Sequence, residues 1–72
     1  MSQPQKVQIK IKGKLQQTWS GWLEGMDIQH DPSGNTILSG TIPDQAALHG
    51  LLIRIRDLGI PLLEVKVEIE EA

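Results

Sequence analysis

The sequence predicts an α+β fold, a two-layer sandwich of the ferredoxin-like type with the element order βαββαβ and a short first helix. Three observations predict it. Apolar and polar residues alternate in two segments near the ends of the chain, 6–13 and 62–70. A hairpin pattern occupies 26–42, and a helical pattern follows it at 44–58. Strands and helices therefore share one short chain.

The two terminal strands carry opposite charges on their polar faces. The first 16 residues contain four lysines and no acidic residue, whereas the last nine contain four glutamates and one lysine. Opposite charges on neighbouring strands stabilise a sheet by about 0.2–1 kcal/mol per pair. We therefore expect the strands at 6–13 and 62–70 to lie side by side and antiparallel.

A short helix is expected at 15–24. At helical spacing Leu15, Trp19, Trp22 and Leu23 form one apolar stripe, whereas a strand would place the two tryptophans on opposite faces. Gly21 weakens such a helix, so packing must hold it in place. The alternative replaces this helix by more strand, which gives a βββαβ meander with one helix.

The middle of the chain contains the clearest signals. Turn-forming residues at 31–35 separate apolar segments at 26–30 and 36–42, which predicts a β-hairpin. Asp44 is placed to cap the main helix, and Gly59 followed by Pro61 ends it. The buried stripe of that helix is expected to comprise Leu48, Leu51, Leu52, Ile55 and Leu58. In the predicted sheet, 26–30 and 62–70 are the edge strands, and 26–30 is the less protected one.

Length and composition limit the architecture to one domain. The chain has 72 residues, of which 39% are hydrophobic, and no cysteine. A core of this size typically supplies about 3–5 kcal/mol, so self-association would help. We expect a disordered N-terminus at 1–5 and a single α+β domain at 6–70. No apolar run exceeds three residues, and no secretion signal is evident, so a cytoplasmic protein is expected, with no membrane partner.

Composition also argues against several functions found on such sandwiches. The net charge of −2 disfavours nucleic acid, and the absence of Phe and Tyr removes the usual platforms for RNA bases. Without cysteine there is no Cys-x-x-Cys metal site. Arg54 and Arg56 lie late in the main helix, far from the loop where an acylphosphatase-like site would need an arginine. The sequence predicts no catalytic residue, no cofactor and no metal, which leans against an enzyme.

Some polar residues remain candidates for a ligand site. Gln45, His49 and Arg56 share one face of the main helix and would suit an anionic ligand or a protein partner, although a merely solvated face accounts for them too. His30 and His49 lack any metal-ligand spacing. Their possible helpers are aspartates: Asp27, Asp31 and Asp44.

Small and apolar residues complete the candidate interaction surface. Ala46 and Gly50 are four residues apart, a spacing that permits close approach by another element, expected to be the short helix of the same domain or else a second subunit. Ile53 lies off the buried stripe near Gly50. Trp19 and Trp22 are expected in the core, with a role as interface anchors as the alternative.

The helical segment and the residues after it resemble a known type of sequence. Asp-Gln-Ala-Ala-Leu-His-Gly-Leu-Leu at 44–52 and Arg-Asp-Leu-Gly-Ile-Pro-Leu-Leu at 56–63 are similar to the C-terminal signature of a family of uncharacterised short bacterial and archaeal proteins. The similarity extends over about 7–65, and the glutamate-rich end departs from it. The resemblance implies a family and no reaction, substrate or cofactor.

The functional expectation is therefore a small non-catalytic interaction or regulatory module whose partner is another protein or a second copy, as in a homodimer. The alternative is a small-ligand-binding domain or minor enzyme that uses Gln45, His49 and Arg56. Nucleic-acid binding through the lysines of the first strand is the least favoured, because the neighbouring glutamates would neutralise them.

Overall fold

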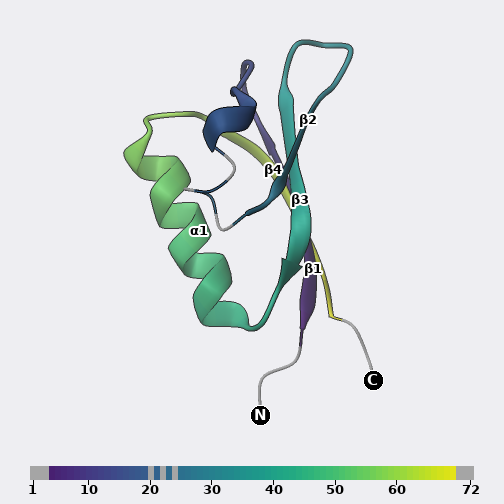
Figure 1. Cartoon of the computed structure of the whole chain (residues 1–72), viewed down its shortest axis with the longest axis vertical. Coiled ribbons are helices and arrows are strands. Elements are labelled where there is room, and N and C mark those ends of the chain that lie inside the picture. The colour runs from purple at the N-terminus through teal and green to yellow at the C-terminus, as the bar shows by residue number, and fades with distance from the viewer. Residues whose placement is uncertain (1–3, 20, 22, 24, 70–72) are drawn as a thin grey trace.

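A four-stranded sheet covered on one face by a single helix forms the fold (Figure 1). The computed structural model describes residues 4–19, 21, 23 and 25–69. Its elements are β1 (Gln5–Ile11), the 3-10 turn η1 (Gln17–Trp19), β2 (Asp27–His30), β3 (Thr36–Ile42), α1 (Gln45–Asp57) and β4 (Leu62–Ile69). The predicted α+β class is confirmed. No helix in the described part of the chain is long and apolar enough to cross a membrane.

The strands are arranged in the order β2-β3-β1-β4, and all neighbours are antiparallel. The expectation that the first and last strands are adjacent is confirmed, since β1 pairs with β4 from Gln5 opposite Ile69 to Ile11 opposite Leu62. The hairpin of β2 and β3 is confirmed as well. A meander would pair β1 with β2, so the alternative βββαβ meander is wrong. That alternative did predict a single α-helix, as the described residues have.

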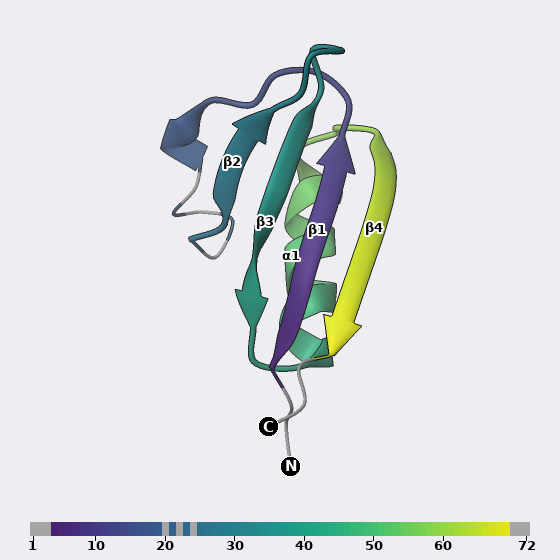
Figure 2. The same ribbon diagram turned by 90° about the vertical axis from the view of Figure 1, so that its right-hand side faces the viewer.

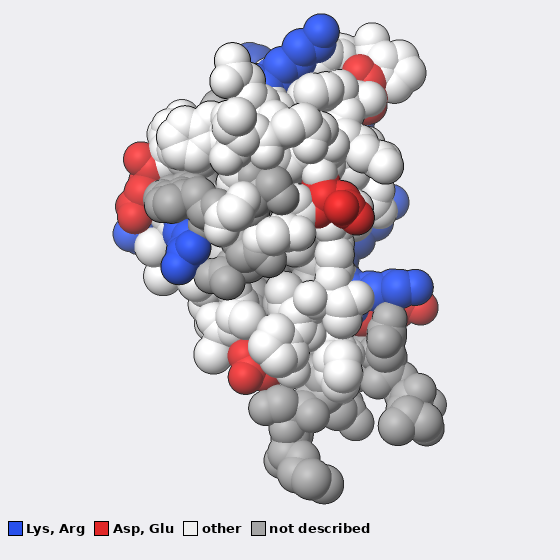
Figure 3. Space-filling model, viewed as in Figure 1, with Lys and Arg blue, Asp and Glu red and all other residues white. Residues whose placement is uncertain are grey.

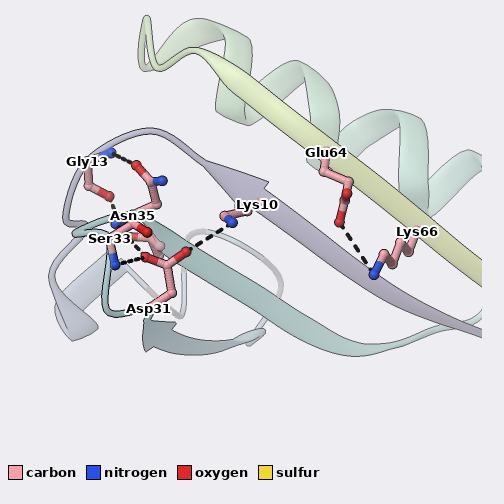
Figure 4. Close-up of polar contacts among 8 residues, drawn as sticks. Lys10, Gly13, Asp31, Ser33, Asn35, Glu64 and Lys66 are labelled. Atoms are coloured by element: carbon pink, nitrogen blue, oxygen red, sulfur yellow. Dashed lines mark hydrogen bonds and ion pairs between the residues drawn. The ribbon is translucent and has the colours of Figure 1, made fainter.

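Cross-strand charges are matched on the face of the sheet that points away from α1. The register places Lys6 opposite Glu68 and Lys10 opposite Glu64. The Lys10 Nζ lies 3.1 Å from Asp31 Oδ2 in the β2–β3 turn, and the Lys66 Nζ lies 3.5 Å from Glu64 Oε1 (Figure 4). Lys10 therefore ties β1 to the hairpin, while Glu64 pairs along its own strand.

The main helix begins and ends as its sequence predicts. The Asp44 side chain accepts a hydrogen bond from the Ala47 backbone N–H at 2.9 Å, which satisfies an amide of the first turn. The chain leaves the helix through Gly59, whose φ of +72° favours glycine. Leu48, Leu51 and Ile55 are buried, and Leu52 and Leu58 are partly buried.

The hydrophobic core lies between the sheet and α1, and a loop residue extends it over β3. Gly40 in β3 leaves room for Met26, because a Cβ built on Gly40 would come within 2.8 Å of the Met26 Sδ. The other buried apolar residues come from β1, β2, β3, α1 and the segment before β2: Val7, Ile9, Ile11, Leu15, Leu23, Ile28, Leu38, Ile42, Leu48, Leu51 and Ile55.

The short helix expected at 15–24 is not formed by the described residues of that segment, which is a correction to the sequence-based prediction. The structure has the three-residue turn η1 there, followed by a turn in which the Leu23 N–H donates to the Trp19 carbonyl at 3.1 Å. Leu15 and Leu23 are both buried, but Trp19 between them is 38% exposed. Among its described residues, the segment is therefore anchored in the core by Leu15 and Leu23 alone, and these residues do not form the continuous apolar stripe predicted for a helix.

Hydrogen bonds to β2 and β3 hold the start of this segment. The Leu15 N–H donates to Thr36 Oγ1 at 2.8 Å, and the Thr36 hydroxyl donates to the Gly13 carbonyl at 2.6 Å. The Leu15 carbonyl lies 2.9 Å from His30 Nε2. In an α-helix the Leu15 carbonyl would accept from the Trp19 N–H, but here the carbonyl is bonded to His30, and the Trp19 N–H donates to the Gln16 carbonyl at 3.1 Å.

The observed bounds of the domain differ slightly from the expected ones. β1 starts at Gln5, which is buried, one residue before the predicted domain start. Most of the expected disordered N-terminus, 1–3, lies outside the described residues, as does the end of the acidic tail at 70–72.

Candidate interaction surface

Three large apolar side chains of β4 are exposed. The exposed fractions are 47% for Leu62, 48% for Leu63 and 42% for Val67. We call these three residues the β4 surface. The register shift between Lys10 and Ile11 lies opposite the Leu62–Leu63 pair, so the strict alternation of β4 breaks there. Exposed apolar side chains gathered on one element are typical of a contact site.

The β4 surface is exposed because one helix cannot cover four strands. Strands spaced by about 4.8 Å make this sheet roughly 15–20 Å wide, whereas a helix is about 10 Å across. Figure 2 shows α1 behind β3 and β1, with β4 at the edge beyond it. The segment around η1 lies at the other side, next to β2 (Figure 2). Of the described β4 side chains, only that of Val65 is partly buried against the core.

The helix flank beside β4 carries the polar residues that the sequence singled out. With 3.6 residues per turn, Gln45, His49 and Arg56 lie along one flank together with Leu52. The right-handed path from β3 through α1 to β4 turns this flank toward β4. Leu52 packs against the core, while Gln45, His49 and Arg56 are exposed. The predicted polar face thus borders the β4 surface.

The two sheet edges differ in how accessible they are. β2 has four residues, and the Gln17 side chain donates to the Ile28 carbonyl at 2.6 Å, so part of this edge is already bonded. β4 has eight residues and, among the described strands, pairs only with β1. The expectation that 26–30 is the less protected edge is therefore wrong, because the loop before β2 folds back onto it.

The opposite face of the sheet is polar and balanced in charge. A shallow hollow there is lined by Lys6 and Lys66 together with Asp27 and Glu68, and by the small side chains of β3. Positive and negative side chains are also interspersed on the side of the molecule seen in Figure 3. Mixed charge of this kind does not favour a polyanion such as nucleic acid.

The outward face of α1 is not approached by another part of the described chain. Ala46 and Ile53 are exposed, Ile53 by 46%, and apart from its chain neighbours and the nearby backbone of α1, no described atom lies within 4 Å of a Cβ built on Gly50. The expectation that the segment 15–24 packs against Gly50 falls in part on residues 20, 22 and 24, which lie outside the described residues, and it stays a prediction. The small residues lie toward solvent, about half a turn from the buried stripe.

Replacing Gly50 by alanine is expected to raise the free energy of unfolding by about 0.5–1 kcal/mol, because glycine is disfavoured inside a helix and there is room for the methyl group. Urea unfolding followed by circular dichroism measures it. Gly59→Ala is the matched control and should destabilise, since Gly59 has a φ of +72°. A destabilising Gly50→Ala would contradict this prediction.

The two tryptophans were expected in the core. Trp19 is 38% exposed on η1, so the expectation of a core position is wrong for it. Trp22 lies outside the described residues, and its predicted role stays a prediction. The turn η1, which contains Trp19, lies beside β2 on the side of the sheet away from β4 (Figure 2).

His30 and Asp31 make structural contacts. The His30 Nε2 lies 2.9 Å from the Leu15 carbonyl and holds the segment before β2. Asp31 Oδ1 fixes the hairpin turn by accepting from the backbone N–H groups of Ser33 and Asn35 at 2.9 and 3.0 Å (Figure 4). The pKa of Asp31 lies below its usual value, mainly because the carboxylate accepts the hydrogen bond from the Asn35 backbone N–H, and also because it pairs with Lys10. Within the described ranges, no three His, Cys, Asp or Glu side chains gather closely enough to hold a metal ion.

Sequence reasoning missed Leu62, Leu63 and Val67 as candidate contact residues. Val67 alternates with polar residues just as a buried strand residue would, and nothing in that pattern says that no helix covers it. The adjacent Leu62 and Leu63 break the alternation, and that irregularity was the available signal.

Comparison with known protein families gave a match. A family described as a domain of unknown function (DUF8691) matches residues 6–66. The chain belongs to this family. The match runs from the second residue of β1 into β4, so it includes Leu62 and Leu63 of the β4 surface but ends one residue before Val67. A search of curated proteins and one of solved structures gave no match.

Proposed function

We propose that this member of the family is a non-catalytic interaction module that associates with itself through the β4 surface. Its scaffold is ferredoxin-like, with the first helix reduced to the turn η1. The adjacency of β1 and β4 and the right-handed connection through α1 support that scaffold. The single observation that carries the proposal is the exposure of three large apolar side chains on one open edge strand.

The energetics of a small domain support self-association. Burying a Leu or Val side chain fully contributes about 1.5–3 kcal/mol, and a core of this size holds only about 3–5 kcal/mol in total. Covering Leu62, Leu63 and Val67, which are each 42–48% exposed, would therefore add a considerable fraction of the stability of the domain. The open edge of β4 offers backbone groups to the same partner.

The test is the molar mass in solution by sedimentation equilibrium, from micromolar to millimolar protein. The mass is expected to rise from 8.0 kDa toward twice that value. Val67→Lys places a charge in the β4 surface and is expected to weaken association about tenfold or more. A mass that stays at 8.0 kDa up to millimolar protein would overturn the proposal.

Ile53→Lys is the matched control. It makes the same kind of change at a side chain of similar exposure, but on the outward face of α1. Association should be unchanged in this variant. Loss of association in Ile53→Lys with retention in Val67→Lys would move the contact site from β4 to the helix.

A further inference from the structure

We propose that two copies pair through their β4 strands, antiparallel and with Val65 opposite Val65 of the partner, to form one sheet of eight strands, four from each copy. This inference rests on the proposed function and adds the geometry of the contact. Both helices would lie on the same face of the joined sheet, because a two-fold axis perpendicular to the sheet keeps each strand face on its own side.

Symmetry limits the possible registers to a few. When two copies of one strand pair about a two-fold axis, one position lies opposite itself, and residues equally far before and after it lie opposite each other. Each choice of central residue therefore fixes every other pair. Val65, Lys66 and Val67 are the candidates near the middle of β4 (Leu62–Ile69).

The charges of β4 distinguish these registers. With Val65 at the centre, Glu64 lies opposite Lys66 of the other copy, and the same pair occurs twice. With Lys66 at the centre, Lys66 lies opposite itself and Glu64 opposite Glu68, so every pair repels. With Val67 at the centre, Lys66 lies opposite Glu68, but the partner position of Glu64 falls beyond the end of β4 (Leu62–Ile69), so no residue of the strand balances its charge. The Val65 register is the one in which each charge of Glu64 and Lys66 finds its opposite.

The apolar residues match in the same register. Leu63 lies opposite Val67 of the other copy, and Val65 lies at the axis between two such pairs. Two of the three residues of the β4 surface are thereby covered by each other. Cross-strand pairs of large apolar residues stabilise a sheet by contact at about 4.5–5.5 Å between Cβ atoms.

The existing contact between Glu64 and Lys66 does not oppose this pairing. The Lys66 Nζ lies 3.5 Å from Glu64 Oε1, and the side chains are 65% and 54% exposed. Exposed ion pairs of this kind are weak, so each group can exchange its partner within the chain for the one across the interface. The glutamates of β4 then select a register instead of blocking the edge.

Charge exchange tests the register. Glu64→Lys brings two lysines face to face across the interface, and Lys66→Glu brings two glutamates face to face. Each variant alone should therefore associate about ten- to a hundredfold more weakly than the unchanged chain. A one-to-one mixture of the two variants restores two opposite pairs and should form heterodimers, as should the double variant with itself. Sedimentation equilibrium measures all four samples, and circular dichroism checks that each variant is folded.

Other outcomes overturn the register. In the Val67 register, Lys66 still meets Glu68 in the Glu64→Lys variant, so that variant would keep its association while Glu68→Lys would lose it. In the Val65 register, Glu68 lies opposite Leu62, and Glu68→Lys should change association little. Equal association by Glu64→Lys and the unchanged chain, or no gain on mixing, contradicts our proposal.

A covalent test is available even if a charge variant fails to fold. The chain contains no cysteine, so Val65→Cys introduces the only thiol, and in the proposed register it lies opposite itself at a spacing that a disulfide can bridge. Oxidation should give a covalent dimer of Val65→Cys but not of Val67→Cys. The reverse result would select the Val67 register, and no cross-linking of either variant would exclude both of these registers.

The outcomes separate this inference from the proposed function. If the unchanged chain stays monomeric, both fail. If it dimerises, Val67→Lys weakens the dimer, and neither charge exchange nor the cysteine variants respond as described, then the β4 surface mediates association by some other geometry, and only the inference fails.

Discussion

Replacing Leu51 by alanine is expected to unfold most of the chain at 25 °C. Leu51 is fully buried at the centre of the α1 stripe, between Leu48 and Ile55. Truncating a buried leucine to alanine costs about 2–5 kcal/mol, because the apolar contact is lost and a cavity remains. A core of this size typically holds only about 3–5 kcal/mol. One substitution can therefore remove nearly all of the stability.

Urea unfolding followed by far-ultraviolet circular dichroism measures this effect, at one fixed protein concentration because association would add stability. Ile53→Ala is the matched control on the same helix, since Ile53 is 46% exposed and alanine is a better helix former. The control is expected to change the free energy of unfolding by less than about 1 kcal/mol. Similar losses in the two variants would mean that the buried stripe of α1 has been misplaced.

Thr36→Val is expected to be the second most damaging change, although the two side chains have nearly the same shape. The Thr36 hydroxyl is fully buried and bonded to both Leu15 and Gly13, and valine can do neither. A buried N–H left without a partner costs about 1–3 kcal/mol. The Leu15 N–H bears this cost, whereas the carbonyl of the exposed Gly13 can turn to water. We expect a loss of roughly 2–3 kcal/mol in total.

The serine variant separates the hydroxyl from the methyl group. Thr36→Ser keeps both hydrogen bonds and loses one buried methyl, so its loss is expected to be about 1 kcal/mol, and clearly smaller than that of Thr36→Val. The same urea titration compares the two. If serine proved the more damaging change, the packing of the methyl group, and not the hydrogen bonds to the loop, would hold the segment before β2.

The accuracy of the sequence-based prediction depended on whether the deciding interactions were local. The strands β1 and β4 could be recognised from alternation, and their adjacency from lysines on one and glutamates on the other. The helix α1 could be recognised from Asp44 and Gly59, whose effects act within one turn. These signals are each carried by a few neighbouring residues.

The segment 15–24 could not be predicted in the same way. Its conformation depends on Thr36 and His30, which lie 21 and 15 residues away from Leu15 in the sequence. A count of apolar spacing within the segment cannot include those hydrogen bonds. Tertiary contacts thus override a weak helical tendency that Gly21 already reduces.

The candidate surface was only partly predictable for a related reason. The polar residues of its border, Gln45, His49 and Arg56, follow from helical periodicity alone. The exposure of Val67 depends on the width of the layer that covers the sheet, and that layer is narrow because the described residues of 15–24 form the short turn η1 and not the predicted helix. Because a helix was predicted at 15–24, the sheet was expected to be fully covered, and the exposure of Val67 in β4 was therefore not predicted.

The central position of β1 has a consequence for how the chain is made. A ribosome produces β1 before both of its partner strands, and of these β4 emerges well after β3, so the nascent chain must keep Val7, Ile9 and Ile11 in solution until β4 has been made. Gln8 and Lys10 between those apolar residues, with Lys6 before them, keep the unpaired strand hydrated. Pairing with β3 protects one side of it earlier, and the arrival of β4 closes the other.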